Sequence, residues 1–292
     1  MTVWPYEGKT LFRNLCSVTG GVWSSMVAPF LFPLPATPIV VFGNQKSGTT
    51  VIATLLAELG GLTRTIDIPV LWPPRVNKVI ERGQGFARTV RKNPLCFAKE
   101  LIKEPNLTFL LPQVKEYFPR GRFLFVVRDP RDNVRSLLDR VGLPGDLSAL
   151  DETHHIPPPW GLLFASEGWG INCDMEDPNY VELLACRWNK CVEMYLQYND
   201  MATMVRYEDF VSNKIGTISQ LAKKLGVRAK KDISAKLDKQ YQRKGDRRNW
   251  PWKRFFGTEN LLKIEKVCDT YMNEMGYSPI TDGPLSGKQI EY

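Results

Sequence analysis

The sequence predicts an α/β protein that folds as a single domain, with helices flanking a central parallel sheet. Two apolar runs, residues 38–42 and 123–127, have the composition of strands that are covered on both faces. Each run leads through a short turn into a stretch whose apolar residues recur at helical spacing. Strand–loop–helix units of this kind build parallel sheets. The 292 residues are enough to bury a substantial core.

Composition and charge are those of a soluble globular protein with an anionic partner. Hydrophobic residues make up 43% of the chain and charged residues 24%. The formal net charge of +8 favours an anionic cofactor, a polyanion or an acidic surface. Six cysteines are scattered without a CxxC pair, which indicates reduced thiols and a cytoplasmic location.

Residues 1–35 are predicted to be an N-terminal extension of the domain. Residues 11–34 are partly apolar, but Arg13, Asn14 and several prolines interrupt them. A membrane-spanning helix needs about 20 consecutive apolar residues, so we predict no transmembrane span, and the pattern of a signal peptide is not met. Residues 22–32 are expected to pack against the sheet, with peripheral contact to a membrane surface as the alternative.

The first strand–loop–helix unit carries a candidate anion site. After the strand at 38–42, residues 43–48 form a loop, and a helix runs from Thr49 to a stop at Gly60-Gly61. The loop can direct backbone N–H groups, hydroxyls and the Lys46 ammonium to one point at the positive end of that helix. The order differs from a Walker A loop, in which Lys and Ser/Thr directly follow the second glycine. An ordinary strand-to-helix turn with a surface lysine is the alternative.

The second unit places an arginine at the end of a strand. Arg128 follows the strand at 123–127, Asp129 is suited to cap the next helix, and Pro130 suits its first position. Ligands bind at this edge of open α/β sheets. Arg128 and Ser136, two turns along the helix, can therefore meet one anionic group. A brace between Arg128 and Asp132 is the competing interpretation.

The remaining segments are predicted as scaffold. Residues 63–74 are expected to be irregular or a short strand, and residues 75–92 are basic and poorly periodic. Helices are predicted over 110–118, 181–198 and 258–275, the last with Thr258 as its cap and Gly276 as its stop. The basic segment 228–248 lacks a nucleic-acid-binding fold, so no nucleic-acid partner is predicted.

Taken together, these signals resemble the P-loop type sulfotransferases that use 3′-phosphoadenosine 5′-phosphosulfate (PAPS). Gln45 to Thr50 is similar to the family's 5′-phosphosulfate loop, with Gln45 in place of Pro, and Arg128 and Ser136 have the spacing of its 3′-phosphate motif. Val205 to Phe210 is similar to the Tyr-Glu-Asp strand end, and Gln242 to Gly245 to the Arg-Lys-Gly segment. The resemblance covers about residues 38–277. It implies a sulfotransferase fold over residues 1–292.

The resemblance also implies the cofactor and its ligands. The cofactor is PAPS, with 3′,5′-adenosine bisphosphate (PAP) as its product, and no metal site is expected. The residues implied in binding are Lys46, Ser47, Gly48, Thr49, Thr50, Arg128, Ser136, Tyr207, Arg243, Lys244 and Gly245. Sulfuryl transfer is then governed by positioning and charge, and Lys46 can stabilise the leaving phosphate.

The general base is left open by the sequence. Small-molecule members of the family have a Lys-Thr-His segment where this chain has Lys103-Glu104-Pro105, so that histidine is missing. Branches that act on carbohydrates and protein tyrosines place a carboxylate about 20 residues after the loop lysine, where Asp67 stands. We favour Asp67, with Glu104 and the histidines His154 and His155 as alternatives.

Residues 143–177 are predicted to be a lid or acceptor-binding insertion. They are rich in Pro, Gly and Trp, and Trp160, Phe164 and Trp169 can offer a flat apolar surface. We expect a hydroxyl-bearing (or amine) acceptor that is a small molecule, a carbohydrate or a lipid; an aromatic-rich loop folded on itself is the alternative. The competing functions are a P-loop nucleotide-dependent kinase-like phosphotransferase and a non-catalytic binding protein.

Overall fold

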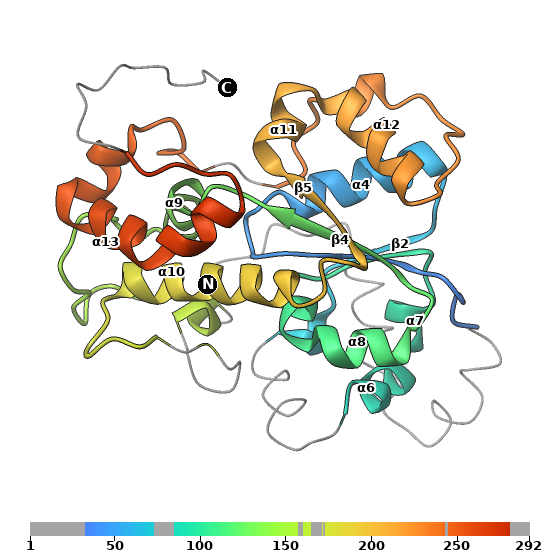
Figure 1. Ribbon diagram of the computed structural model, residues 1–292, viewed down its shortest axis with the longest axis horizontal. Helices are drawn as coiled ribbons and strands as arrows, with labels where there is room; N and C mark the ends of the chain where they lie inside the picture. The colour runs from blue at the N-terminus through green and yellow to red at the C-terminus, as the bar shows by residue number, and fades with distance from the viewer. Residues whose placement is uncertain are drawn as a thin grey trace.

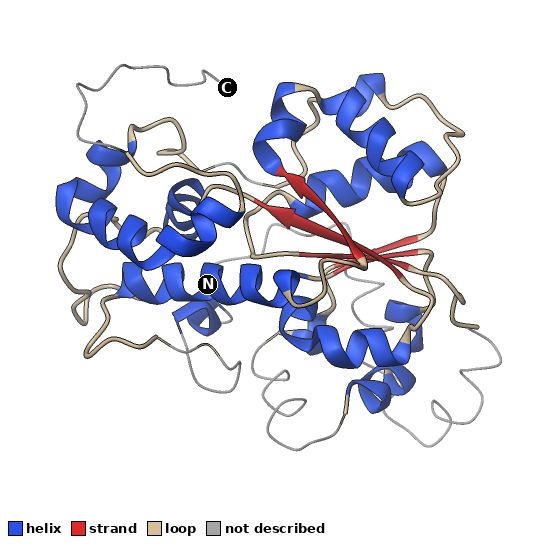
Figure 2. Cartoon of the chain, viewed as in Figure 1, coloured by secondary structure: helices blue, strands red, loops and turns tan. Residues whose placement is uncertain are grey.

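A computed structural model describes residues 33–72, 85–156, 160–164, 171, 173–242 and 245–280. Its centre is a five-stranded sheet in the order β2-β3-β1-β4-β5, in which every neighbouring pair is parallel. The strands are β1 (Ile39–Phe42), β2 (Arg64–Ile66), β3 (Leu101–Lys103), β4 (Arg122–Val127) and β5 (Ala202–Arg206). Figures 1 and 2 show the strands crossing the middle of the molecule between two groups of helices.

The alternation of side chains along β1 explains why the strand is apolar at every position. Ile39 and Val41 pack in one hydrophobic cluster and Val40 and Phe42 in another, and all four are fully buried. Successive side chains of a strand point to opposite faces, so a strand with helices on both sides has no polar face. In register, Val41 pairs with Lys103 of β3 and with Leu124 of β4.

The helices form one layer on each face of the sheet. One layer contains α4 (Thr49–Gly60), α11 (Tyr207–Ser212) and α12 (Lys214–Lys224). The other contains α6 (Phe86–Lys92), α7 (Pro94–Phe97), α8 (Leu111–Tyr117), α9 (Pro130–Val141), α10 (Tyr180–Leu196) and α13 (Trp252–Glu274). Short 3-10 turns complete the description at η2 (Pro69–Leu71), η3 (Pro105–Leu110), η4 (Trp160–Phe164) and η5 (Ser234–Lys236).

The topology fixes where a ligand can bind. From β1 the chain first builds the side of the sheet with β3 and β2, and then crosses to build β4 and β5 on the other side. The loops that leave β1 and β4 therefore emerge next to each other at the carboxyl edge and turn into helices on opposite faces, α4 and α9. A crevice at such a switch of direction is the usual ligand site of open α/β sheets.

The predicted α/β fold with a central parallel sheet flanked by helices is confirmed. The expectation for residues 75–92 was wrong in its second half. Residues 86–92 form α6 although they were expected to be poorly periodic, since Phe86 and Val90 bury one face against the core. The helix predicted from Thr258 lies within α13: the chain kinks at Gly257, whose φ of 67° is not helical, and a short helical segment from Trp252 precedes the kink. Its stop at Gly276, with φ of 73°, lies where the sequence placed it.

The expectation that the cysteines are reduced was also wrong. Cys173 of the insertion and Cys186 of α10 form a disulfide, with 5.8 Å between their Cα atoms. No CxxC spacing predicts this pair, because the two cysteines are apart in the sequence and the fold brings them together. Disulfides are typical of oxidising compartments, so the cytoplasmic location loses its support from the cysteine pattern. Within the described ranges, no helix is both long and apolar enough to span a membrane.

The core predicts a large cost for removing an aromatic ring from β4. Phe125 is 1% exposed and stacks on Tyr195 of α10 with 4.6 Å between ring centroids. Phe125→Ala should therefore lower the free energy of unfolding by about 3–5 kcal/mol, measured by urea unfolding. Leu262→Ala is the control, because Leu262 is 55% exposed and should change stability by less than about 0.5 kcal/mol. Equal effects of the two substitutions would contradict this packing.

Candidate functional site

The loop after β1 has the backbone of an anion-binding turn. Lys46 and Gly48 both have left-handed conformations, with φ of 67° and 90°, on either side of Ser47. Turns that combine left- and right-handed residues direct successive N–H groups toward one point and bind anions there. Gly48 cannot be replaced without strain, because a Cβ at this position would lie 2.2 Å from Cδ2 of Tyr207.

The amino end of α4 adds to this turn. Gly48 is the N-cap residue of α4, and no side chain caps the first turn of the helix. The first N–H groups of a helix have no partner within it and carry partial positive charge. In a twelve-residue helix whose first turn follows directly on the Lys46 loop, these groups suit a phosphate or sulfate oxygen.

A buried asparagine, which the sequence analysis missed, holds the loop in place. Asn133 of α9 is fully buried, and its Nδ2 donates to the Gln45 carbonyl at 2.9 Å and to Ser47 Oγ at 3.0 Å. Its Oδ1 accepts a hydrogen bond from Asn44 Nδ2 at 2.9 Å. One feature of the sequence could have indicated this role: Asn133 is a polar residue near the start of the helix, directly before Val134, which belongs to the hydrophobic core. This network joins the loops after β1 and β4.

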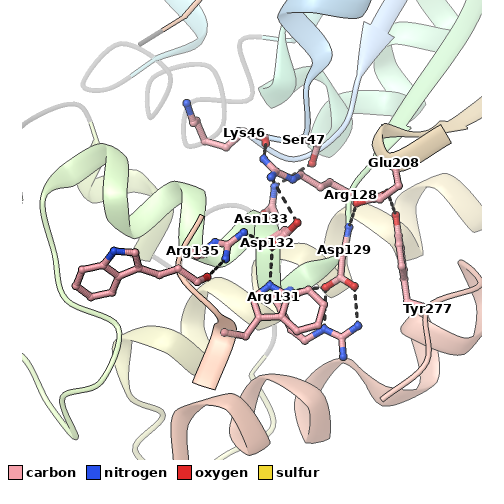
Figure 3. A network of polar contacts seen from close by, with 12 residues as sticks. Lys46, Ser47, Arg128, Asp129, Arg131, Asp132, Asn133, Arg135, Glu208 and Tyr277 are labelled. Atoms are coloured by element: carbon pink, nitrogen blue, oxygen red, sulfur yellow. Dashed lines mark hydrogen bonds and ion pairs between the residues drawn. The ribbon is translucent and has the colours of Figure 1, made fainter. Parts of the chain in front are cut away.

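Arg128 reaches from the end of β4 to the Lys46 loop (Figure 3). Its Nη1 donates to the Lys46 carbonyl at 3.3 Å, its Nη2 lies 3.6 Å from Asp132 Oδ2, and its guanidinium stands 4.8 Å from the centre of the Tyr207 ring. The brace to Asp132 therefore exists together with the contact to the loop. Ser136 is half-buried one turn beyond Asp132 on α9, so it follows on the same side of the helix.

Positive charge accumulates around Lys46. Burial, followed by the nearby positive charges of Arg140, Arg128 and Lys103, lowers the pKa of Lys46 to about 8, against the raising effect of Asp139. A buried ammonium surrounded by like charges is unfavourable until an anion joins it. The residues present thus fit a nucleotide phosphate or phosphosulfate, and they come from the carboxyl ends of β1, β3 and β4 and from the end of α9.

A second polar network fixes the start of α9, from which Arg128 and Ser136 are presented. Asp129 caps the helix and pairs with Arg131, which also donates to Glu265 of α13 at 2.6 Å. The Asp129 N–H donates to Glu208 at 3.0 Å, and Glu208 accepts from Tyr277 at 2.9 Å. Figure 3 shows Asp129, Arg131, Glu208 and Tyr277 in one network next to Arg128. The site's edge is therefore braced by both α11 and α13.

Two of the candidate bases lie together beside the sheet. Asp67, just after β2, is 37% exposed at its side chain and pairs with Lys103 Nζ at 2.5 Å. Glu104, directly after Lys103, is fully buried and accepts from the N–H of Ile68 at 2.7 Å. Burial, together with the negative charge of Asp67, raises the pKa of Glu104 to about 7, against the lowering effect of Lys103. Lys103 was not singled out from the sequence.

The histidines lie in a separate turn of the insertion. His154 Nδ1 lies 2.8 Å from Asp151 Oδ1, and His155 is exposed. Trp160, from the same insertion, does approach the site: its ring contacts that of Trp72 edge-on with 5.6 Å between centroids, and Arg140 lies over it at 5.4 Å. Phe164 packs against the core, and Trp169 lies outside the described residues.

The segment that carries the predicted Arg-Lys-Gly motif is attached on both sides. Gln242 Nε2 donates to Thr50 Oγ1 at 2.9 Å, which ties the segment to the first turn of α4. Arg247 Nε donates to Asp139 Oδ1 of α9 at 3.1 Å. Gly245 passes so close to Asp139 that a Cβ there would clash with the carboxylate. Arg243 and Lys244 lie outside the described residues, as do residues 1–32 of the N-terminal extension.

The fold is α/β, with a candidate anion site in the Lys46 loop at the carboxyl edge of the sheet. The chain matches no protein-family model and no curated protein. It is similar to solved sulfotransferases, at low identity. The STF9 sulfotransferase of Mycobacterium avium is 11% identical with a TM-score of 0.49, covering 86% of this chain and 80% of that one.

Two further solved structures show a likeness of the same degree. The STF1 sulfotransferase of Mycobacterium tuberculosis is 13% identical with a TM-score of 0.48, covering 89% of this chain and 82% of that one. Mouse sulfotransferase SULT7A1 complexed with PAP is 14% identical with a TM-score of 0.48, covering 85% and 89%. Likeness at this level concerns the course of the chain, and the chemistry of the site rests on this chain's own residues.

The raised pKa of Glu104 predicts a pH dependence of stability. The folded state holds a proton at Glu104 up to about pH 7, whereas the ordinary glutamate pKa is 4.5, so stability due to this group is present below pH 4.5 and lost as pH rises toward 7. The slope is at most about 1.4 kcal/mol per pH unit. Urea unfolding at pH 5, 6 and 7 should show this decline in the wild type and a weaker one in Glu104→Gln. Parallel curves would contradict the assignment.

Proposed function

We propose that this protein is a sulfotransferase that transfers the sulfuryl group of PAPS to a hydroxyl-bearing acceptor. One observation carries the proposal: the left-handed loop, the start of α4, Lys46 and Arg128 converge at the carboxyl edge of β1 and β4, where Lys46 is buried among like charges. The residues that converge are those through which the sequence resembles the PAPS-dependent family.

The loop and the two basic residues divide the binding work. Backbone N–H groups from Ser47 to Thr50 suit the 5′-phosphosulfate, and Arg128 with Ser136 suits the 3′-phosphate. Tyr207, whose ring packs on Gly48 and under Arg128, offers a flat face for the adenine. When bound, PAPS supplies a sulfuryl group that leaves a phosphate behind.

The chemistry that this chain must supply is charge stabilisation and removal of one proton. Lys46 places an ammonium, buried and therefore weakly screened, where negative charge develops on the leaving phosphate. Asp67 accepts the proton of the acceptor hydroxyl while the oxygen of that hydroxyl bonds to sulfur. The bridging S–O bond breaks, and its electron pair goes to the phosphate oxygen. Lys103 stands beside Asp67 and orients its carboxylate.

Trp72 and Trp160 favour an acceptor with a flat apolar part. Both rings are partly exposed, and they meet edge-on next to the Glu104 and Arg140 side chains. Indole faces pack well on aromatic rings and on the apolar faces of sugars. A phenol or a carbohydrate therefore fits this wall better than a small polar alcohol.

Nucleotide binding gives the first test. PAP, without metal, should raise the melting temperature of the wild type, because a ligand at about 100 times its Kd adds roughly 2.7 kcal/mol to stability. Arg128→Ala should lose most of this shift, since the guanidinium is the charge offered to the 3′-phosphate. Thermal unfolding with PAP and with ATP–magnesium measures both. A shift with ATP–magnesium alone would favour the kinase-like alternative and contradict the proposal.

A further inference from the structure

We propose that Glu104 is a positioning residue that sets Asp67 and the Lys46 loop relative to each other, and that it is not itself the base. The inference rests on the proposed function, in which Asp67 accepts the proton. It assigns different roles to two carboxylates that follow the carboxyl ends of the neighbouring strands β2 and β3.

The Glu104 carboxylate has no room for an acceptor. Its Oε2 accepts hydrogen bonds from the Ile68 N–H at 2.7 Å and from Trp72 Nε1 at 2.9 Å, and its Oε1 accepts from the Asn106 N–H at 3.0 Å. The residue is 0% exposed. A general base must lie within hydrogen-bond reach of the proton that it removes, and three protein donors already surround this carboxylate.

Asp67 has the opposite character. Its side chain is 37% exposed, and its φ of 62° is an unusual left-handed conformation for a residue with a side chain. Such strain costs of order 1–3 kcal/mol and persists only where the surroundings impose it. Here the Asp67 N–H donates to the Lys103 carbonyl at 2.9 Å, and the next N–H, that of Ile68, donates to Glu104. Both sides of Asp67 are thus tied to β3 and its carboxyl end.

The same carboxylate connects Asp67 to the lysine loop. Asn106, whose N–H binds Glu104, accepts through Oδ1 a hydrogen bond from Gln45 Nε2 at 2.7 Å. Arg187, fully buried in α10, donates to both Gln45 and Asn106. Gln45 directly precedes Lys46, so a short chain of buried hydrogen bonds sets the ammonium relative to the Asp67 loop. Such fully buried networks hold a single geometry.

A double-mutant cycle tests this role. Asp67→Asn, Glu104→Gln and the double variant are compared by the rate of PAP release from PAPS, with 4-nitrophenol, N-acetylglucosamine or water alone as acceptor. Asp67→Asn should lose about 10²–10⁴-fold in kcat, as expected for a general base. Glu104→Gln should lose up to about 10²-fold, the cost of a displacement near 1 Å. Because much of the effect of Glu104 passes through Asp67, the loss of kcat in the double variant should be clearly smaller than the product of the two single losses.

Two further variants separate positioning from general loss of stability. Trp72→Phe removes one donor to Glu104 and should lower kcat less than Glu104→Gln, with the Kd for PAP almost unchanged. Glu265→Gln is the matched control. Glu265, in α13, is also buried, and it accepts hydrogen bonds from a backbone N–H and from a side chain. In a variant that combines Glu265→Gln with Asp67→Asn, the two losses of kcat should multiply.

The outcomes that overturn the inference are distinct from failure of the proposed function. Losses from Asp67→Asn and Glu104→Gln that multiply in the double variant would make Glu104 an independent catalytic group. Near wild-type activity in Asp67→Asn with a large loss in Glu104→Gln would make Glu104 the base. A wild type that releases no PAP with any acceptor would contradict the proposed function together with the role of Glu104.

Discussion

The structure depends on one turn of backbone, from Gly43 to Gly48, in which the left-handed residues Lys46 and Gly48 direct the chain into α4. That turn is costly by itself, since Lys46 has a side chain and a positive φ. Three contacts stabilise it. Asn133 donates hydrogen bonds to the Gln45 carbonyl and to Ser47 Oγ, the Tyr207 ring packs against Gly48, and Arg128 donates to the Lys46 carbonyl. The cost is acceptable where the conformation collects N–H groups and cations for an anion.

The parallel sheet explains how residues far apart in the chain reach this turn. Every strand of the sheet points the same way, so the carboxyl ends of β1, β3 and β4 lie at one edge and bring Lys46, Lys103 and Arg128 together. Burial lowers the pKa of Lys46, and repulsion from the like charges around it lowers the pKa as well. Repulsion that an anion relieves is a physical reason for affinity, independent of any likeness to other proteins.

Much of this was predictable from the sequence, for a physical reason. The strands at 38–42 and 123–127 are continuous apolar runs, and the turns that follow carry Gly48 and Pro130, whose backbone preferences are strong. What the sequence did not predict depends on three-dimensional contact. The support by Asn133, the disulfide between Cys173 and Cys186, and the pairing of Lys103 with Asp67 all join residues from separate elements, and no spacing rule links them.

The rate of PAP release from PAPS in the presence of EDTA tests the central claim most directly, when it is compared between the wild type and Lys46→Met. If Lys46 stabilises the leaving phosphate, the wild type turns over without metal and Lys46→Met loses about 10²–10³-fold in kcat, the usual cost of removing one such group. The Kd for PAP should then change far less than kcat. A rate that requires magnesium, or one that Lys46→Met leaves intact, would contradict the role given to this loop.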